Sequence, residues 1–257
     1  MQRYKSKYTG PQMDVAFERA LPGGAIDLSL TDKQFLEFLD NTDFTNPIAQ
    51  AGVGGMHGSV AYALDRWKLL SGTVSWNSNG LTLNGTIRQI REYPIGFDVV
   101  PSIEMHFGTA KITYDDTTKC CDITSSGGVI KRSHLGIAAI TDWSKVPKPD
   151  KGLTMQKCRE YYIKSEKSIS LFAKDNWNFY AQSQSFPSTM RTTPSVIVYS
   201  AINGTANALS TNSETPFPDF TDFTISATTD GFNFQLNGTL TAGNFYAARG
   251  YDAIADV

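Results

Sequence analysis

The sequence predicts a mainly β protein made of two antiparallel β-sandwich modules, preceded by a short N-terminal arm with a helix. Two observations predict this class. Segments of alternating apolar and polar residues recur at regular spacing, and turn residues rather than long helical patterns separate them. The chain of 257 residues is also long enough to bury the cores of one or two domains without disulfides or metal.

Residues 1–30 are predicted to form the arm. Pro11 stands at a favourable first helical position, and Pro22-Gly23-Gly24 ends the apolar pattern that follows it. A helix this short is marginal alone, so we expect it to lie against another molecule. The residues expected to anchor the arm are Tyr8, Met13, Phe17 and Leu21.

The first β-module is predicted over residues 31–147. It opens with an ambiguous run: Thr31-Asp32-Lys33-Gln34 resembles a helix capping box ahead of Phe35, Leu36, Phe38 and Leu39, although the same run could enter a strand. Strands are predicted from Ser71 onward, in a hairpin that turns at Asn79-Gly80. "SIEMHFGTAKITYDD", "KCCDIT" and "GGVIKRSHLGIAAI" continue the pattern.

Residues 148–257 are predicted to form a C-terminal β-sandwich, which follows a Pro- and Lys-rich junction at 145–152. "LTMQKCREYYIKSEKSIS" is expected to begin with a short helix. Strands are then predicted in "TTPSVIVYSAI", in "DFTISATTDGFNFQLNG" around an Asp230-Gly231 turn, and in "GNFYAARGYDAIADV". "LNGT", which occurs at 83–86 and 236–239, is interpreted as hairpin or bulge chemistry rather than as a glycosylation signal.

One apolar run, "YALDRWKLL" at 62–70, fits two templates. A helix would align Val60, Leu64 and Trp67, whereas a strand would place Trp67 and Leu69 on one face. Periodicity alone leaves both open.

Three stretches together resemble bacteriophage tail-fibre and head-fibre proteins, which are built from jelly-roll modules similar to carbohydrate-binding modules. They are "FLDNTDFTNPIAQAG" followed by "YALDRWKLL", then "KCREYYIKSE", and finally "SFPSTMRTTPSVIVYSA". The resemblance covers roughly residues 35–257. It implies jelly-roll-like modules, and it departs from the family in lacking a Phe-x-x-Trp-x-Lys strand between Glu92 and Ile123.

The resemblance implies that "ALDRWKLL" is a strand with Trp67 in the core. Asp65 and Arg66 would then point to opposite faces. We expect Asp65 to accept hydrogen bonds from the preceding loop, and Arg66 to lie toward the surface.

Composition and motifs argue against several function classes. A net charge of −2 makes nucleic acid an improbable partner, and no apolar segment predicts membrane insertion or a signal peptide. Cys120, Cys121 and Cys158 have no metal-ligand spacing, and neither do His57, His106 and His134; on a strand the vicinal cysteines would face opposite sides. We therefore predict no metal and no cofactor.

Catalysis is not predicted either. A glycan depolymerase needs two carboxylates facing each other across a cleft. The candidates are Glu92, Asp98, Glu104, Asp115 and Asp116, and a turn-located Asp-Asp is more often turn chemistry. We expect no catalytic residues.

Sugar recognition without catalysis needs exposed aromatic faces beside amide or acid groups. "KDNWNFY" offers the best candidates, Trp177 and Tyr180 with Asn176 and Asn178, because polar residues surround the tryptophan. Trp143, Tyr246 and Tyr251 are further candidates. For each of these aromatics, packing in a core is the competing interpretation.

The resemblance implies a virion structural protein, a short fibre or spike whose arm anchors to other virion proteins and whose β-domains bind host-surface glycans. The family, and the need to protect exposed strand edges, favour a homotrimer. Two alternatives remain: a head fibre or capsid decoration protein without a specific receptor, and a depolymerase.

Overall fold

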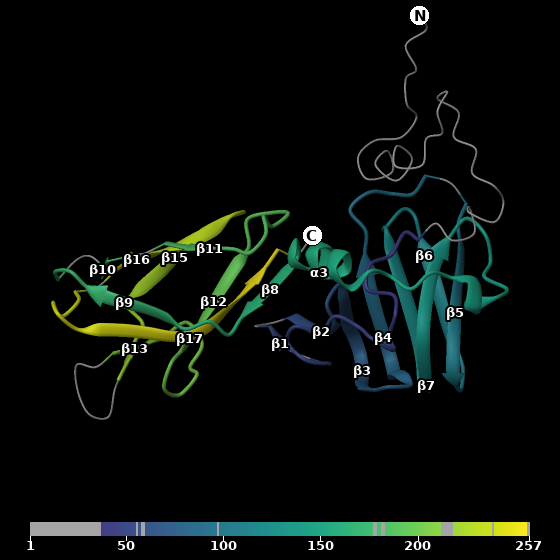
Figure 1. Cartoon of the computed structure of the whole chain (residues 1–257), viewed down its shortest axis with the longest axis horizontal. Helices are drawn as coiled ribbons and strands as arrows, with labels where there is room; N and C mark the ends of the chain where they lie inside the picture. Colours follow the sequence, from purple (N-terminus) through teal and green to yellow (C-terminus); the bar gives the residue numbers. More distant parts are fainter. Residues whose placement is uncertain are drawn as a thin grey trace, which may run out of the picture.

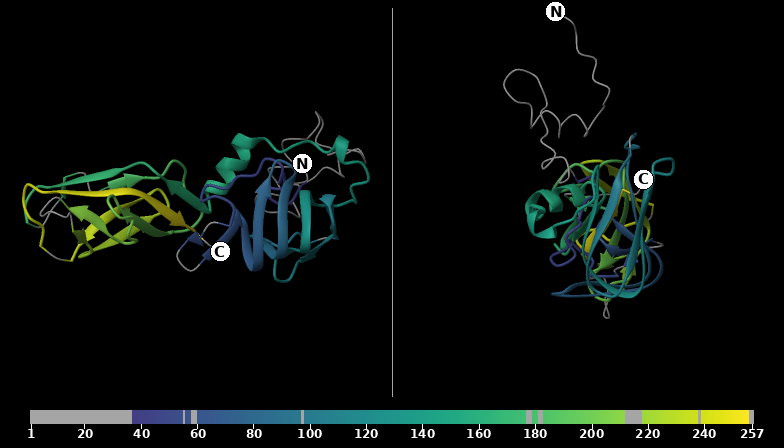
Figure 2. Two further views of the ribbon diagram at one scale, coloured as in Figure 1. Left: turned by 90° about the horizontal axis from the view of Figure 1, so that it is seen from below. Right: turned by 90° about the vertical axis from the view of Figure 1, so that its right-hand side faces the viewer.

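The computed structural model describes residues 37–257 except 55, 58–59, 97, 177–178, 181–182, 212–217, 238 and 256–257. The chain forms two β-rich units that lie end to end along the long axis of the molecule (Figures 1 and 2). The predicted mainly β, antiparallel class is confirmed. The arm and its anchoring residues Tyr8, Met13, Phe17 and Leu21 lie outside the described residues.

The N-terminal unit is one seven-stranded antiparallel sheet in the order β1-β2-β3-β4-β7-β5, with β6 also paired to β7. Its jelly-roll character is therefore not confirmed, because a jelly roll divides its strands between two sheets. Its strands are β1 (Met56–His57), β2 (Val60–Leu64), β3 (Trp67–Asn77), β4 (Gly80–Ile90), β5 (Val100–Phe107), β6 (Ala110–Asp115) and β7 (Cys120–Gly136).

The longest strand of this unit, β7, pairs with β4 on one side and with both β5 and β6 on the other. β5 and β6 follow one edge of β7 in succession, from Val100 opposite Gly136 to Asp115 opposite Cys120. They are separated at Gly108-Thr109, where the Ser125 hydroxyl donates to the Thr109 carbonyl at 2.8 Å. On β7 the vicinal cysteines face opposite sides as predicted, with Cys121 buried and Cys120 half-buried.

The predicted hairpin between β3 and β4 is also present, but it turns at Ser78-Asn79 rather than at the predicted Asn79-Gly80, because Asn77 pairs with Gly80. Further along these strands, Gly72 and Gly85 face each other with φ of +83° and +139°. A Cβ on Gly72 would lie 1.8 Å from the Asn84 carbonyl oxygen, so this close approach requires glycine. The pairing of β4 with β7 shifts between Leu83 and Asn84, which agrees with the bulge interpretation of "LNGT".

The inner face of the sheet is covered by the irregular segment 38–54. Phe38 and Leu39 are not helical, because this segment takes the place of a strand beside the C-terminal end of β7. Phe38 N donates to the Leu135 carbonyl at 3.0 Å, and Phe44 N donates to the Lys131 carbonyl at 2.9 Å. The buried core beneath it contains Leu39, Phe44, Ala63, Leu64, Trp67, Leu81, Leu83, Ile87, Ile95, Cys121, Ile123, Ile130 and Leu135.

Trp67 is fully buried, as predicted. Its ring meets Phe44 edge-on at 5.7 Å, and its indole N–H donates to the Asn41 carbonyl at 3.1 Å. The surrounding run is not a single strand, however. β2 ends at Leu64 and β3 begins at Trp67, so Asp65 and Arg66 form a tight turn with Arg66 at a φ of 74°.

The predicted role of Asp65 is confirmed. Its carboxylate is buried and accepts hydrogen bonds from Gln50, from the backbone N–H at 3.0 Å and from Nε2 at 2.6 Å. Its backbone carbonyl accepts from Asn41 Nδ2 at 2.8 Å. Asp65 thereby holds the loop at 41–50 against the sheet.

The predicted surface position of Arg66 is wrong, because only 8% of its side chain is exposed. The guanidinium stacks on the Tyr161 ring at 3.4 Å. It also pairs with Asp40 at 3.2 Å and donates to the Ile90 carbonyl at 3.0 Å. Arg66 therefore joins the two units.

The C-terminal unit begins with the predicted short helix, α3 (Lys151–Arg159). This helix starts at the end of the Pro- and Lys-rich segment 145–152 and follows the 3₁₀ turn η1 (Trp143–Lys145). Asp150 caps α3 by accepting from Leu153 N at 2.7 Å. The strands are β8 (Tyr162–Ser165), β9 (Ile169–Ala173), β10 (Phe179–Tyr180), β11 (Ser183–Ser185), β12 (Ser195–Ser200), β13 (Leu209–Thr211), β14 (Asp219–Phe220), β15 (Phe223–Thr228), β16 (Gly231–Leu236) and β17 (Phe245–Ile254).

This unit is a two-sheet sandwich. β17 is central to a seven-stranded sheet, pairing with β9 and β13 through its first half and with β8 and β12 through its second. β11, β16 and β15 form the opposing sheet. Aromatic rings fill the space between them, with Phe232 edge-on to Tyr251 at 5.1 Å and Phe220 edge-on to Tyr246 at 5.0 Å. The predicted strands around 195–200, 223–236 and 245–254 are present.

The contacts that hold the two units together, here called the junction, lie around α3 and β8. Besides the stack on Arg66, the Tyr161 hydroxyl accepts from Arg191 at 3.0 Å, and Arg191 also pairs with Glu92. Gln50 Nε2 donates to the Tyr162 carbonyl at 2.9 Å. A stacked ring, an ion pair and a hydrogen bond to a backbone carbonyl thus connect the two units.

The first prediction concerns Asp65. Asp65→Ala should lower the free energy of unfolding by about 1–3 kcal/mol, because it removes the acceptor of the Gln50 backbone N–H and one of the two acceptors of Gln50 Nε2. Urea denaturation measures the change. Asp98→Ala removes an exposed aspartate and is the matched control, which we expect to have little effect. Equal stability of the two variants would contradict the assigned role.

The second prediction concerns the junction. Tyr161→Ala removes the ring beneath Arg66 and should lower the free energy of unfolding by about 2–4 kcal/mol. Because the units would then be less coupled, calorimetry should resolve two transitions, and small-angle scattering should show a broader distribution of distances. Tyr93→Ala, at a tyrosine that is 47% exposed, is the control. A single unshifted transition in Tyr161→Ala would refute the coupling.

The third prediction concerns the thiols. Burial raises the pKa of both Cys121 and Cys158, so little thiolate forms there at neutral pH. A disulfide reagent should therefore modify Cys120 rapidly in the native protein, and the other two only in denaturant. Cys120→Ser should abolish the fast reaction. A second fast thiol in that variant would show that the core opens more readily than its packing implies.

Candidate functional site

Of the four residues predicted to bind sugar, the structure describes Asn176 and Tyr180, next to β9 and in β10 at the end of the C-terminal unit that lies away from the N-terminal unit (Figure 1). Trp177 and Asn178 lie outside the described residues. Asn176 is exposed in the turn after β9, and Tyr180 belongs to β10. The structure thus places the described pair on adjoining pieces of one sheet.

Backbone hydrogen bonds fix this turn to the loop before β17. Leu240 N donates to the Asn176 carbonyl at 2.9 Å. Gly243 N donates to the Ala173 carbonyl at 3.1 Å, and Ala173 N donates to the Asn244 carbonyl at 3.0 Å. The end of β9 is therefore held firmly beside the start of β17.

Alternation along these strands directs two phenylalanines outward. On β9, Ile169, Leu171 and Ala173 are buried, so Phe172 faces away from the sandwich core. On β17, Tyr246 is buried and the preceding Phe245 is 55% exposed. The two outward rings contact each other at 4.9 Å in an edge-on arrangement.

These residues are in register with the predicted Tyr180. Phe172 pairs with Tyr180 on one side and with Phe245 on the other, so the three positions form a line across β10, β9 and β17. We call Phe172, Phe245 and the strand position of Tyr180 the aromatic row. Sequence reasoning missed both phenylalanines, although the alternation in "ISLFA" and "FYAA" could have indicated their outward direction.

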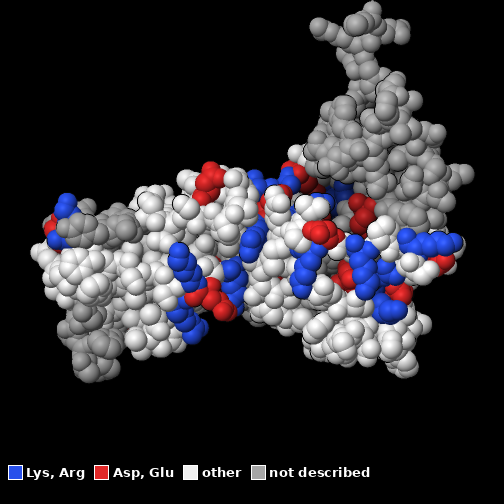
Figure 3. Space-filling view, in the orientation of Figure 1, with Lys and Arg blue, Asp and Glu red and all other residues white. Residues whose placement is uncertain are grey.

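The charge distribution distinguishes the two ends of the molecule. On the face drawn in Figure 3, Lys, Arg, Asp and Glu gather over the N-terminal unit and around the junction, whereas the far end of the C-terminal unit has few charged atoms apart from one small group at its edge. Lys174 and Asp175 precede Asn176 in the turn after β9. An exposed aromatic surface of low charge suits a neutral, partly apolar ligand.

The other aromatic candidates serve in packing. Tyr246 and Tyr251 are buried in the sandwich core. The Trp143 ring lies 5.1 Å from the Arg132 guanidinium, and its carbonyl accepts a hydrogen bond from the same arginine. Of the sequence candidates that the structure describes, Asn176 and Tyr180 remain close to the aromatic row.

Three of the carboxylates considered for catalysis, Glu104, Glu92 and Asp116, have structural contacts. Glu104 pairs with Lys131 and with Arg132, each at 2.6 Å. Burial alone would raise the pKa of Glu104, but these two cations lower it below its ordinary value. Glu92 pairs with Arg191, and Asp116 accepts from the Tyr114 hydroxyl at 2.8 Å. These acids stabilise loops and the junction.

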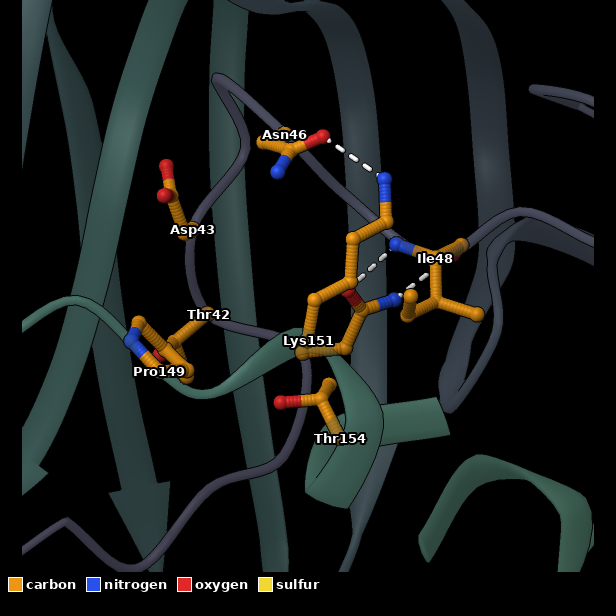
Figure 4. A pocket seen from close by; sticks show the side chains of 8 residues that line it. Thr42, Asp43, Asn46, Ile48, Pro149, Lys151 and Thr154 are labelled. Carbon is orange, nitrogen blue, oxygen red and sulfur yellow. Dashed lines mark hydrogen bonds between the residues drawn. The ribbon is translucent and has the colours of Figure 1, made fainter. Parts of the chain in front are cut away.

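A small open pocket lies between the loop at 41–48 of the N-terminal unit and the start of α3 (Figure 4). Its wall includes Lys151, whose ammonium donates to Asn46 Oδ1 at 2.8 Å across the opening. The space accommodates about one water-sized group, which is too little for a sugar ring. The lining residues are Asn41, Thr42, Asp43, Asn46, Ile48, Pro149, Lys151 and Thr154.

The described part of the chain contains neither a candidate metal site nor a candidate membrane-spanning helix. No group of three or more His, Cys, Asp or Glu residues is placed there to hold a metal ion. No helix among the described residues is long and apolar enough to cross a membrane.

Known proteins do not extend this description. No family model matches the chain, and no curated protein or solved structure is significantly similar to it. The aromatic row is therefore the feature on which a functional proposal has to rest.

Proposed function

We propose that the chain is a structural protein of a bacteriophage virion, a short fibre or spike that binds host-surface glycans through the far end of its C-terminal unit. The observation that carries this proposal is the aromatic row, in which Phe172 and Phe245 contact each other on the outer face of the sheet and Phe245 is 55% exposed. Pyranose rings present apolar C–H faces that pack on such side chains, while their hydroxyls bond to amides such as that of Asn176.

The shape of the molecule supports the same proposal. A receptor-binding appendage has to hold its binding surface at a distance from its anchor. Here the aromatic row lies beyond the junction, where the Tyr161 ring contacts Arg66 and its hydroxyl accepts from Arg191. We propose that residues 1–30 attach the protein to other virion proteins and that three copies assemble. Sedimentation of the purified protein tests the trimer.

We propose binding rather than catalysis. Glu104 and Glu92 are engaged in ion pairs, and Asp116 is engaged in turn contacts, so each has a structural use that does not require a substrate. The alternative without a receptor is a head fibre or capsid decoration protein.

The test of the proposal removes the aromatic row. Phe172→Ala combined with Phe245→Ala should weaken binding to host cells or to arrayed host glycans by about five- to a hundredfold, since each ring supplies about 0.5–1.5 kcal/mol of contact. Because both residues face outward, the fold should persist, and circular dichroism checks this. Trp177→Ala tests the sequence candidate in the same assay.

The matched control is Phe107→Ala, which removes a phenylalanine that is 70% exposed in the N-terminal unit. It should leave binding unchanged. Equal binding by the double variant and the native protein would refute the aromatic row as the receptor site. Particles that carry the protein, with no binding to any host surface, would favour the decoration protein instead.

A further inference from the structure

Arg249, in the middle of β17, is a charged residue whose donors the fold does not use. Its side chain is exposed, and it forms no hydrogen bond or ion pair with any of the described residues. By contrast, Arg66, Arg88, Arg132 and Arg191 each pair with a carboxylate. The five N–H donors of the Arg249 guanidinium therefore have no acceptor within the described part of the chain.

Packing nevertheless fixes where this guanidinium lies. Its central carbon is 5.9 Å from the centroid of the Tyr199 ring, which is within the range of a cation–π contact. On Gly204, whose φ is +76°, a Cβ would lie 2.5 Å from Arg249 Nη2, so the guanidinium rests against the backbone of that turn. Tyr199 is itself held, because its hydroxyl donates to the buried carboxylate of Asp252 at 2.6 Å. The donors of Arg249 are thus positioned without being occupied.

Arg249 lies on the same face of β17 as the aromatic row. Tyr246 and Ala248 point into the sandwich core, where both are buried. Alternation along the strand therefore places Phe245, Ala247 and Arg249 on the outer face. The exposure pattern agrees, because Phe245 and Arg249 are exposed and Ala247 is half-buried.

Only small side chains stand between the aromatic row and Arg249 on the central strands. Ala247 pairs with Ser170 on β9 and with Ser210 on β13. At about 3.3 Å per residue, the four steps from Phe245 to Arg249 span about 13 Å of the strand. This span exceeds the length of one sugar ring, so a glycan that reaches both contacts is an oligosaccharide.

We propose that Arg249 binds the carboxylate of an acidic sugar, in a glycan whose neutral rings pack on the aromatic row. The planar guanidinium matches a carboxylate in both charge and geometry, because two of its N–H groups can donate in parallel to the two oxygens. Since Gly204 and Tyr199 already hold the side chain, binding requires little further ordering. This inference rests on the proposed function, and it narrows the ligand from host-surface glycans to acidic ones.

The experiment measures binding of the full chain to host-surface polysaccharide before and after chemical reduction of the polysaccharide's carboxylates to alcohols. The native protein should bind the intact form about tenfold more tightly, because hydrogen bonds between charged groups are stronger than those to a neutral hydroxyl. Arg249→Gln should bind both forms with the affinity that the native protein has for the reduced form. Added salt should weaken binding of the native protein to the intact form more than to the reduced form.

Three further variants separate the position of the guanidinium from its charge. Lys167→Gln removes an exposed positive charge from the same unit and should keep the tenfold preference. Arg249→Lys keeps the charge without the paired donors and should keep only part of the preference. Gly204→Ala displaces the guanidinium and should lower the preference while leaving binding to the reduced form unchanged. Thermal melting confirms that each variant is folded before its binding is compared.

Three outcomes would overturn the inference. If the native protein binds both forms equally and depends on Phe172 and Phe245, the proposed function stands and the acidic-sugar contact is refuted. If Lys167→Gln loses the preference as fully as Arg249→Gln does, overall charge rather than a site at Arg249 accounts for it. If the native protein binds neither form, both proposals are wrong.

Discussion

The architecture depends on a buried arginine. Removing a guanidinium from water costs several kcal/mol unless its charge and donors are matched. At Arg66 the carboxylate of Asp40, the carbonyl of Ile90 and the face of Tyr161 together supply that match. Asp40 and Ile90 belong to the N-terminal unit and Tyr161 to the C-terminal unit, so the arginine is fully satisfied only when the two units are joined.

The backbone conformation of Arg66 is less stable than an ordinary one, and the contacts of its guanidinium offset this difference. A non-glycine residue with a φ of 74° is less stable than in the ordinary regions by about 1–2 kcal/mol. The turn keeps this conformation because the side chains of its two residues bind different parts of the molecule. Asp65 is held by Gln50, while Arg66 is held across the junction. One tight turn thus fixes both the covering loop and the neighbouring unit, which favours a stiff body over two units on a flexible linker.

Local features of the fold could be predicted from the sequence. Alternating patterns located β12, β15, β16 and β17, and the vicinal cysteines faced opposite sides as strand geometry requires. The single sheet of the N-terminal unit could not be predicted, because the pairing of β7 with β4 and β5 joins residues far apart in the chain. The position of Arg66 was missed for a related reason: no local pattern indicates that a turn residue will meet an aromatic ring from another unit.

The candidate site could be predicted only in part, again because strand pairing brings together residues that are far apart in the chain. Polar neighbours identified the segment around Asn176 and Tyr180, but Phe172 and Phe245 become one surface only when β9 pairs with β17. Single exposed apolar residues are ordinary on protein surfaces, and Leu153 or Ile202 needs no explanation. Two phenylalanines that contact each other in register are different, because two paired strands fix them on the same outward face. The exposed part of Phe245 is apolar surface that a bound ligand would remove from water.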